Sequence, residues 1–474
     1  MPRIISSDSH IVEPREVFDS LQPRFGDSAP HVERDEKRGD VIVVPGVSAD
    51  DGVGQVVPVG RLGIAGRRLD DPDTQRMVNG GYATIRAGIT DPLERLKDQD
   101  LDGVSCEVLY PSLFFRVFGL TNPEMVVAAF RTYNDWLAAY CSAVPDRLLG
   151  LALLPMHDPA AARSELERAL ALGYRGGCIP CTSPAGMPYH NKAYDGVWAA
   201  AQEAEFSLAM HSFTGAQQGG IQASAGPIAT YASAPVIIQT TATELIAGGV
   251  AHRFPTLKFV LGEWNTGWIA NWLERLDHAF YRARFAAPAE IDLKPSEYWR
   301  RQFYATFEDD RYGILTAEGI GVETLMWASD FPHHDSVWPH SLQVLDEVFA
   351  GDDDLGPGGG GRPVARPGDR VDLRPRDADR AGPGRLDREP AQPGLHHDDG
   401  ARLVRRGVRG VDLGRRPAHP PDLHPGLRER PRHHPRRHGP PAEPPRARRL
   451  PRDAPLRGAA VAPRGDRKST RLNS

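Results

Sequence analysis

The sequence predicts that residues 1–350 fold as a (β/α)8 barrel, the TIM-barrel architecture. Short β-branched or apolar runs alternate there with stretches that repeat apolar residues at helical spacing, which is typical of stacked βα units around a parallel sheet. Eight strands with intervening helices are expected to close into a barrel. We expect these strands near residues 3–8, 104–109, 148–154, 174–179, 206–211, 257–263, 302–307 and 324–330.

The connections between the strands carry the helical signal. AARSELERALALG repeats apolar residues at helical spacing and ends at Gly173, which predicts a glycine at the helix C-terminus. The first interval is too long for a simple loop. It holds a β-prone insert at about residues 31–75, followed by the helical stretch DPLERLKDQDLDG. We expect the insert to lie over the barrel mouth or to mediate a subunit contact.

The composition changes abruptly after residue 350. Residues 351–474 hold 28 basic and 17 acidic residues, a net charge of +11, so the first 350 residues carry −16 of the chain's net −5. The tail also holds 20 of the 43 prolines and contains no Ile, Phe, Tyr, Trp, Met or Cys. Such a segment cannot bury enough apolar surface to offset its conformational entropy, so we expect it to be disordered.

This tail has two interpretations. The switch into Arg, Pro, Gly, Asp and His after WPHSLQVLDEVFAG resembles a GC-rich gene read in the wrong frame, and DRKSTRLNS at 466–474 resembles a translated sequencing adapter. We therefore interpret 351–474 as a frameshift product that ends in adapter-like sequence. The alternative is an arginine-rich arm that attracts RNA or anionic surfaces.

Charge, hydropathy and cysteine usage of the first 350 residues limit the function classes. A region this acidic does not favour nucleic acid, and no apolar run approaches the roughly 20 residues that cross a bilayer. The cysteines suggest no disulfide framework, and the first strand leaves no room for a secretory signal. We expect a cytoplasmic protein that binds neither nucleic acid nor membrane.

Carboxylate and imidazole side chains end three of the expected strands. Asp8 and His10 close the first strand, and they share a face because side chains at i and i+2 of a strand point the same way. His211 ends FSLAMH, and Asp330 ends LMWASD. The carboxyl ends of barrel strands meet at one mouth, so we expect these four side chains to converge. The ligand mix predicts one divalent metal ion, with zinc or manganese favoured over calcium or magnesium.

Several stretches resemble the amidohydrolase-related family, and more narrowly its branch that includes aminocarboxymuconate-semialdehyde decarboxylase. They include DSHIVEP, RLKDQDLDGVSCEVLYPS and SDFPHHDSVWPHS, within a similarity that spans about residues 4–350. The resemblance implies that Asp8 and His10 match the first-strand ligand pair, often His-x-His. It also implies that His211 is the fifth-strand ligand and that Asp330 is the eighth-strand aspartate. A small-molecule substrate and a homodimer are implied as well.

The chemistry that the resemblance implies has two routes with the same ligands. In a hydrolase, the metal ion lowers the pKa of a bound water, and Asp330 takes its proton as the water attacks a carbonyl. In a non-oxidative decarboxylase (a carboxy-lyase), the ion polarises the substrate while a protonated group supplies a proton to the carbon that loses CO2. We expect one of these activities on a small carboxylated or cyclic compound, with Asp330 and His211 as catalytic residues. The alternative is a catalytically inactive barrel that serves binding or assembly.

Three residues near the strand ends are further candidates. Relatives often place a histidine after the sixth strand, where this chain reads LGEWNTGW, so Glu263 or Asn265 would have to fill that role. Glu13 can bond neighbouring backbone, the reading we favour, or reach into the site.

Three histidines complete the candidate set. His333 and His334 follow Asp330 closely, and each can orient that carboxylate or remain a structural loop residue. His157 lies near the end of the third strand, where a site residue and a packing residue are about equally expected.

Overall fold

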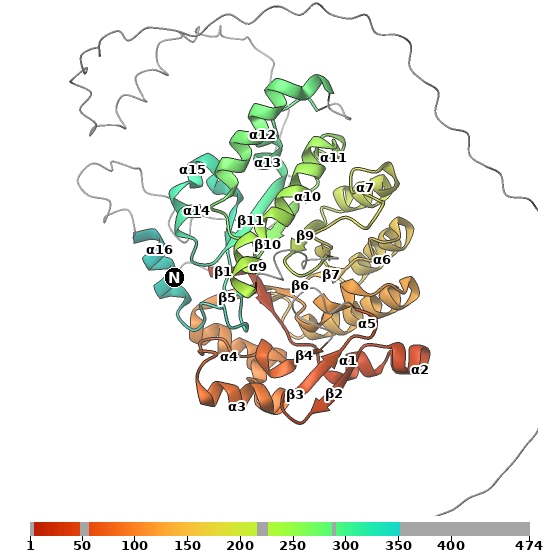
Figure 1. Cartoon of the computed structure of the whole chain (residues 1–474), viewed down its shortest axis with the longest axis vertical. Helices are drawn as coiled ribbons and strands as arrows, with labels where there is room; N and C mark the ends of the chain where they lie inside the picture. The colour runs from red at the N-terminus through yellow and green to blue at the C-terminus, as the bar shows by residue number, and fades with distance from the viewer. Residues whose placement is uncertain (1–3, 48–55, 216–225, 287–290, 351–474) are drawn as a thin grey trace, which may run out of the picture. The chain divides into compact units, whose positions relative to one another are not determined.

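Parallel strands close into a ring in the computed structural model, which describes residues 4–47, 56–215, 226–286 and 291–350 (Figure 1). The predicted barrel-like fold is confirmed, and the predictions for 351–474 lie outside the described residues. The third strand is split at Leu151, whose backbone N–H donates to Leu109 O at 3.2 Å. In order, the ring contains β1 (Ile4–His10), β5 (Val104–Tyr110), β6 (Leu148–Gly150) with β7 (Ala152–Leu153), β8 (Gly176–Ile179), β9 (Ser207–His211), β10 (Phe259–Gly262), β11 (Phe303–Phe307) and β12 (Leu325–Trp327).

The ring closes between its first and last strands through backbone hydrogen bonds. Asp330 N donates to Asp8 O at 3.0 Å, and His10 N donates to Phe331 O at 2.6 Å. Residues from opposite ends of the described chain therefore lie side by side at the carboxyl end of the barrel.

Two expected strands end earlier than the sequence pattern indicates. β12 ends at Trp327 and β10 ends at Gly262, so Asp330 and Glu263 lie in the loops beyond them. Both residues have left-handed backbone angles, with φ of 51° and 59°. A residue with that φ cannot continue a strand, so each chain turns where it reaches the mouth of the barrel.

Helices cover the outside of the ring (Figure 1). Asp91, Asn122 and Asp158 each accept backbone N–H groups of the helix that follows, and a proline stands at the next position. Gly173, with φ of 98°, follows the predicted helix as expected. The helices are α1 (Arg15–Asp19), α2 (Gln22–Phe25), α3 (Pro72–Gly80), α4 (Pro92–Asp102), α5 (Pro123–Ser142), α6 (Pro159–Ala171), α7 (Asp195–Glu203), α9 (Pro227–Ser233), α10 (Pro235–Ala247), α11 (Val250–Arg253), α12 (Ile269–Ala283), α13 (Pro295–Gln302), α14 (Arg311–Leu315), α15 (Ala317–Ile320) and α16 (Ser341–Ala350).

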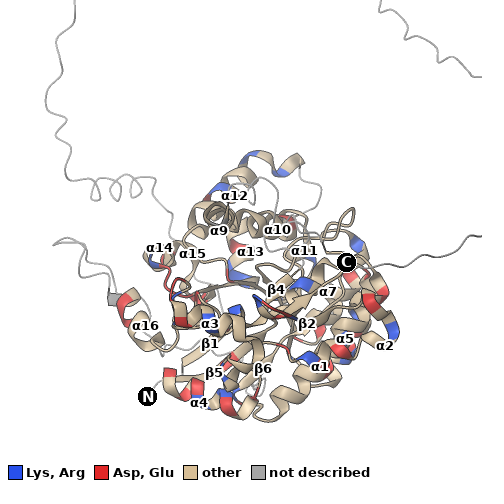
Figure 2. Ribbon diagram, turned by 60° about the horizontal axis from the view of Figure 1, so that its bottom comes forward, with Lys and Arg blue, Asp and Glu red and all other residues tan. Residues whose placement is uncertain are grey.

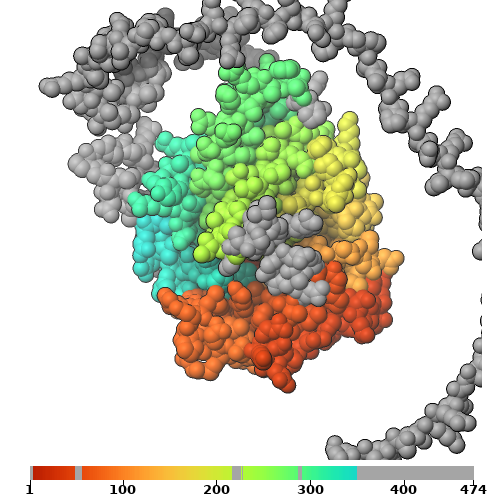
Figure 3. Space-filling view, viewed as in Figure 1, coloured from red at the N-terminus to blue at the C-terminus, as the bar shows by residue number. Residues whose placement is uncertain are grey.

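A small antiparallel sheet interrupts the barrel sequence between β1 and β5. It consists of β2 (His31–Asp35), β3 (Gly39–Val43) and β4 (Val56–Pro58), paired in that order. Ala65, which follows this sheet, donates its N–H to Pro332 O at 3.0 Å, in the loop beyond β12. The N-terminal part of the chain, red to orange in Figure 3, gathers along one edge of the molecule.

The buried core of the described residues consists largely of apolar and aromatic side chains, from the strands and from the helices around them. Trp198, Trp264 and Trp299 are among the largest fully buried side chains. Lys, Arg, Asp and Glu are frequent on outer helices such as α4 (Figure 2). Among the described residues, no helix combines the length and apolar character needed to cross a membrane.

Candidate metal centre

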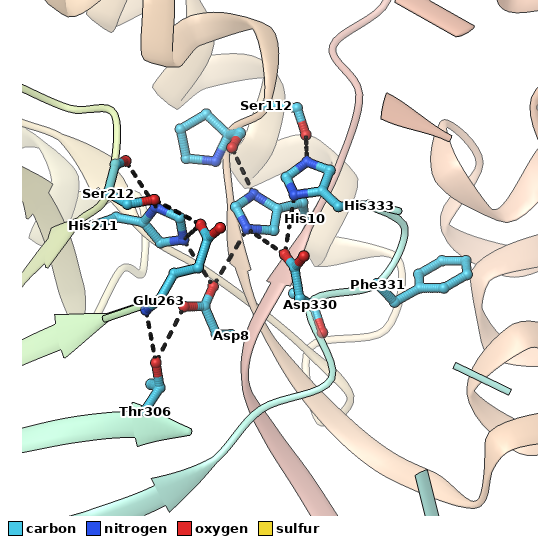
Figure 4. Close-up of polar contacts among 12 residues, drawn as sticks. Asp8, His10, Ser112, His211, Ser212, Glu263, Thr306, Asp330, Phe331 and His333 are labelled. Carbon is cyan, nitrogen blue, oxygen red and sulfur yellow. Dashed lines mark hydrogen bonds and ion pairs between the residues drawn. The ribbon is translucent and has the colours of Figure 1, made fainter. Parts of the chain in front are cut away.

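Four side chains from three parts of the ring meet at its carboxyl end (Figure 4). Asp8 and His10 come from β1, His211 is the last residue of β9, and Asp330 follows β12. Each is at most 2% exposed. The alternation of β1 places Asp8 and His10 on one face, as the sequence pattern requires. The structure thus brings together all four residues that were expected to converge.

The ligand atoms of these residues lie at contact distance. His10 Nε2 is 3.5 Å from Asp8 Oδ1 and 3.2 Å from Asp330 Oδ1. His211 Nε2 is 3.3 Å from the same oxygen of Asp8. Ligand atoms of Asp8, His10 and His211 all lie within 4.8 Å of one another. Because metal–ligand bonds to N and O are about 2.0–2.2 Å long, one cation can serve these atoms together.

The hydrogen bonds of the two histidines fix which ring nitrogen is available. His10 Nδ1 is 2.7 Å from Pro111 O, and His211 Nδ1 is 2.9 Å from Ser212 O. A carbonyl oxygen can only accept, so both Nδ1 atoms carry the proton. In the neutral imidazole Nε2 then holds the lone pair, and both Nε2 atoms face the cluster. A metal-binding histidine typically has this arrangement.

The same atoms have no hydrogen-bond partner. Among the described residues, Asp8 Oδ1, His10 Nε2, His211 Nε2 and both Oδ atoms of Asp330 are buried polar atoms without such a partner. Leaving so many buried polar atoms unsatisfied would cost several kcal/mol. A divalent cation would satisfy Asp8 Oδ1, His10 Nε2 and His211 Nε2 together, and Asp330 Oδ1 lies 3.2 Å from His10 Nε2 beside them, so the residues fit the metal ion that the sequence predicts.

The electrostatics of the cluster separate the two histidines. Burial, together with the nearby His333, lowers the pKa of His10 to about 4, so its Nε2 is unprotonated at neutral pH. Burial also opposes charge on His211, but the Asp8 and Glu263 carboxylates raise the pKa of that imidazole to about 9. Surroundings that favour a proton at His211 Nε2 equally favour a cation there.

Asp330 also contacts His333, which in turn contacts Ser112. Burial disfavours its charge, but His333 and His10 hold the pKa of Asp330 well below its usual range. His333 Nδ1 lies 3.0 Å from Asp330 Oδ1, and His333 Nε2 lies 3.0 Å from Ser112 Oγ. One imidazole therefore connects the Asp330 carboxylate to the loop after β5.

Glu263 directly follows β10, the sixth strand of the ring. Its Oε2 lies 3.1 Å from His211 Nε2 and accepts a hydrogen bond of 2.8 Å from Ser212 Oγ. Burial raises the pKa of Glu263 to about 7. Its backbone N–H donates to Thr306 Oγ1 at 2.9 Å. Glu263 rather than Asn265 therefore contacts the cluster.

The remaining candidates lie away from the four ligand atoms. Glu13 is fully buried and accepts backbone N–H groups of residues 112–114, and burial raises the pKa of its carboxyl to about 7. Asn265 accepts a bond from Trp268 through its carbonyl oxygen. His157 is half-buried in the loop before α6, and His334 is exposed. Neither histidine belongs to a metal-ligating group of the described residues.

Sequence reasoning missed several residues of the centre. Ser112 follows the end of β5, as other site residues follow their strands, and the strand-end rule could have found it. Ser212 and Thr306 are ordinary hydroxyl residues that carry no sequence signal. Gly262 has no room for a side chain, because a Cβ there would lie 3.0 Å from Asp8 Oδ2 and 3.0 Å from His211 Cδ2.

Comparison with known proteins finds relatives of this chain in sequence and in fold. Residues 113–356 match the model of the amidohydrolase family. Gamma-resorcylate decarboxylase of Rhodococcus jostii (strain RHA1) is 28% identical over 254 residues, which are 48% of this chain and 75% of that protein. The solved amidohydrolase map2389c of Mycobacterium avium subsp. paratuberculosis K-10 has a TM-score of 0.57 at 19% identity, over 74% of this chain and 94% of that one. The dihydroxybenzoic acid decarboxylase of Polaromonas sp. JS666, solved with bound manganese and the inhibitor 2-nitroresorcinol, has a TM-score of 0.50 at 18% identity, over 73% and 91%.

Proposed function

The chain belongs to the amidohydrolase family, and we propose that it is a metal-dependent decarboxylase that releases CO2 from a small aromatic carboxylic acid. The observation that carries this proposal is the cluster of buried ligand atoms without hydrogen-bond partners in Asp8, His10, His211 and Asp330. The curated relatives narrow the choice between hydrolase and carboxy-lyase, because several are gamma-resorcylate decarboxylases. One divalent cation is the cofactor, and manganese is favoured because similarly folded decarboxylases were solved with it.

Asp8, His10, His211 and Asp330 would hold the cation. When bound, the cation supplies positive charge that orients an anionic substrate and stabilises negative charge that develops on it. The Pro111 and Ser212 carbonyls keep both imidazoles in the ligating tautomer. Since the centre is buried, few water molecules compete there with the substrate's own oxygen atoms.

The reaction needs a proton but no oxidant. Breaking the bond between the ring carbon and the carboxylate leaves the electron pair on that carbon and releases CO2. The carbon then takes one proton. The protonated His333 imidazole is the source that we assign to this proton, because its Nδ1 lies 3.0 Å from Asp330 Oδ1 and can pass a proton through that carboxylate to the carbon. Burial opposes a charge on His333, but the adjacent Asp330 raises the pKa of that imidazole, which keeps it able to donate.

The proposal is tested on the full chain with two measurements. Metal content is determined after manganese or zinc supplementation and desalting. Aromatic acids such as 2,6-dihydroxybenzoate, the ligand in one similarly folded decarboxylase, are then screened for CO2 release, and lactones and amides for acid release. We expect about one divalent ion per chain and CO2 release. Acid release without CO2 would identify a hydrolase, and a chain without metal or turnover would identify the inactive barrel.

The finer predictions about organisation are part of the same proposal. We propose that residues 1–350 form the catalytic barrel and that the insert at about 31–75 borders its mouth, supported by the bond from Ala65 to Pro332. A homodimer and a cytoplasmic location remain expectations. Gel filtration of the purified chain tests the first.

A further inference from the structure

Glu13 lies outside the ligand cluster, yet it is one of the most heavily bonded carboxylates in the described chain. It is fully buried. Its oxygens accept the backbone N–H groups of Ser112 at 3.1 Å, Leu113 at 2.8 Å and Phe114 at 3.3 Å. These three groups begin the short helical turn η5 (Leu113–Gly119), so one carboxylate fixes the start of the loop that follows β5.

The loop that Glu13 holds makes three contacts with the metal centre. Its Pro111 O accepts from His10 Nδ1 at 2.7 Å. Ser112 Oγ lies 3.0 Å from His333 Nε2. The Phe115 ring stacks on the His211 ring, with centroids 4.6 Å apart and an angle of 28°, and its edge meets the His10 ring at 5.6 Å. One loop therefore contacts three imidazoles of the centre, those of His10, His211 and His333.

We propose that Glu13 is a positioning residue that sets the metal affinity of the centre through the loop 111–115. The inference rests on the proposed function only in taking the cluster to be a metal site. If the Glu13 carboxylate is removed, three buried N–H groups lose their acceptor, and the loop must move to find other partners. His10 then loses the fixed carbonyl that holds its Nδ1 proton. Removing such a partner typically weakens metal binding about 10–100-fold.

The test compares two buried glutamates. Glu13→Gln keeps the side-chain size but leaves a single oxygen to accept from three N–H groups. Glu165→Gln is the matched control, because Glu165 is also buried and accepts from Arg131 and Asn134, but it lies on α6 outside the barrel. Both variants are made in the full chain and checked for fold by circular dichroism. Manganese affinity is measured by competition with a chelator, and the visible absorption of the cobalt-loaded protein reports the ligand geometry.

We expect Glu13→Gln to bind manganese at least about 10-fold more weakly and to shift the cobalt spectrum. Glu165→Gln should leave both readouts unchanged, whatever it does to thermal stability. Equal manganese affinity and equal cobalt spectra in wild type and Glu13→Gln would overturn the proposal. If Glu13→Gln does not fold, Glu13→Asp, which keeps the charge but shortens the reach, is judged by the same two readouts.

The measurements of CO2 release and of manganese affinity distinguish a failure of the proposed function from a failure of the role of Glu13. A wild-type chain that holds manganese but releases no CO2 would reject the decarboxylase and leave the role of Glu13 open to the affinity measurement. A wild-type chain that decarboxylates, with a Glu13→Gln variant of equal metal affinity, would reject only the role of Glu13.

Discussion

Asp330 donates its backbone N–H to the carbonyl oxygen of Asp8 at 3.0 Å, so a bond that closes the barrel also joins two of the four residues that we propose as metal ligands. The first and last strands are the part of the ring that the chain assembles from its most distant segments. Closure of the fold and formation of the centre are therefore the same event. Substitutions can separate the two only where a side chain serves one of them alone.

His211 offers such a separation. It contributes Nε2 to the cluster and is the last residue of β9, so His211→Ala should remove a ligand without breaking the ring. We expect metal retention to fall at least about 100-fold, while helical content stays nearly unchanged. Metal analysis after desalting, with circular dichroism, checks this, and His157→Ala serves as the control. Full metal occupancy of the His211 variant would remove that residue from the ligand set.

Gly262 tests how tightly the centre is packed. In Gly262→Ala the new methyl would lie 3.0 Å from Asp8 Oδ2 and from His211 Cδ2, so both ligands must shift. We expect metal affinity to fall about 10-fold or more, because the two ligands are displaced but not removed. Gly319→Ala is the matched control, since its Cβ would meet only the Ala270 side chain at 3.6 Å. Titration with manganese compares the two variants. Equal affinities would show that the ligands can accommodate the added methyl group without losing the metal.

His333 separates chemistry from metal binding. Its ring stacks on that of His10 at 4.0 Å, but its Nδ1 faces Asp330 and its Nε2 faces Ser112, so His333→Gln should retain the metal while slowing proton transfer through Asp330. We expect kcat to fall about 100-fold or more, as is usual when a general acid–base is lost. Turnover and metal content are measured on the same preparation. Loss of metal from this variant would instead make His333 a ligand.

Arg95 stabilises the region where the first and last strands of the ring meet. It is fully buried, pairs with Glu107 at 2.7 Å, and donates to His10 O at 2.8 Å. Arg95→Met leaves the Glu107 carboxylate buried without its cation, so we expect a loss of about 3–5 kcal/mol in unfolding free energy. Arg163→Met, which removes an exposed pair, should change it by no more than about 0.5 kcal/mol. Urea unfolding checks both, and similar midpoints would contradict this role for Arg95.

Glu13 predicts a pH dependence of stability. Burial raises the pKa of its carboxyl from 4.5 to about 7, so between those values the folded protein holds a proton that the unfolded chain releases. The contribution of Glu13 to stability is thus fully present below pH 4.5 and is lost as pH rises to about 7. Over this pH range the unfolding free energy of the wild type should fall by about 3 kcal/mol relative to that of Glu13→Gln. Urea midpoints at pH 5 and pH 8 test the sign, and a wild-type gain at higher pH would contradict it.

The sequence by itself determined the order of the barrel strands and pointed to the four residues that we propose as ligands. Both depend on local patterns, namely apolar runs of strand length and the carboxylate or imidazole that ends each run. The period of a strand already places Asp8 and His10 on one face, and parallel strands necessarily gather their carboxyl ends at one mouth. None of this requires knowledge of a distant contact.

Only the tertiary structure decided how those residues are held. The Pro111 carbonyl that fixes the His10 tautomer, the Glu13 carboxylate behind it and the absent side chain of Gly262 act through space, on partners distant in the chain. The left-handed turn at Asp330 is likewise set by the hydrogen bonds of barrel closure. A local pattern cannot encode such contacts, because each depends on where the rest of the ring places its backbone.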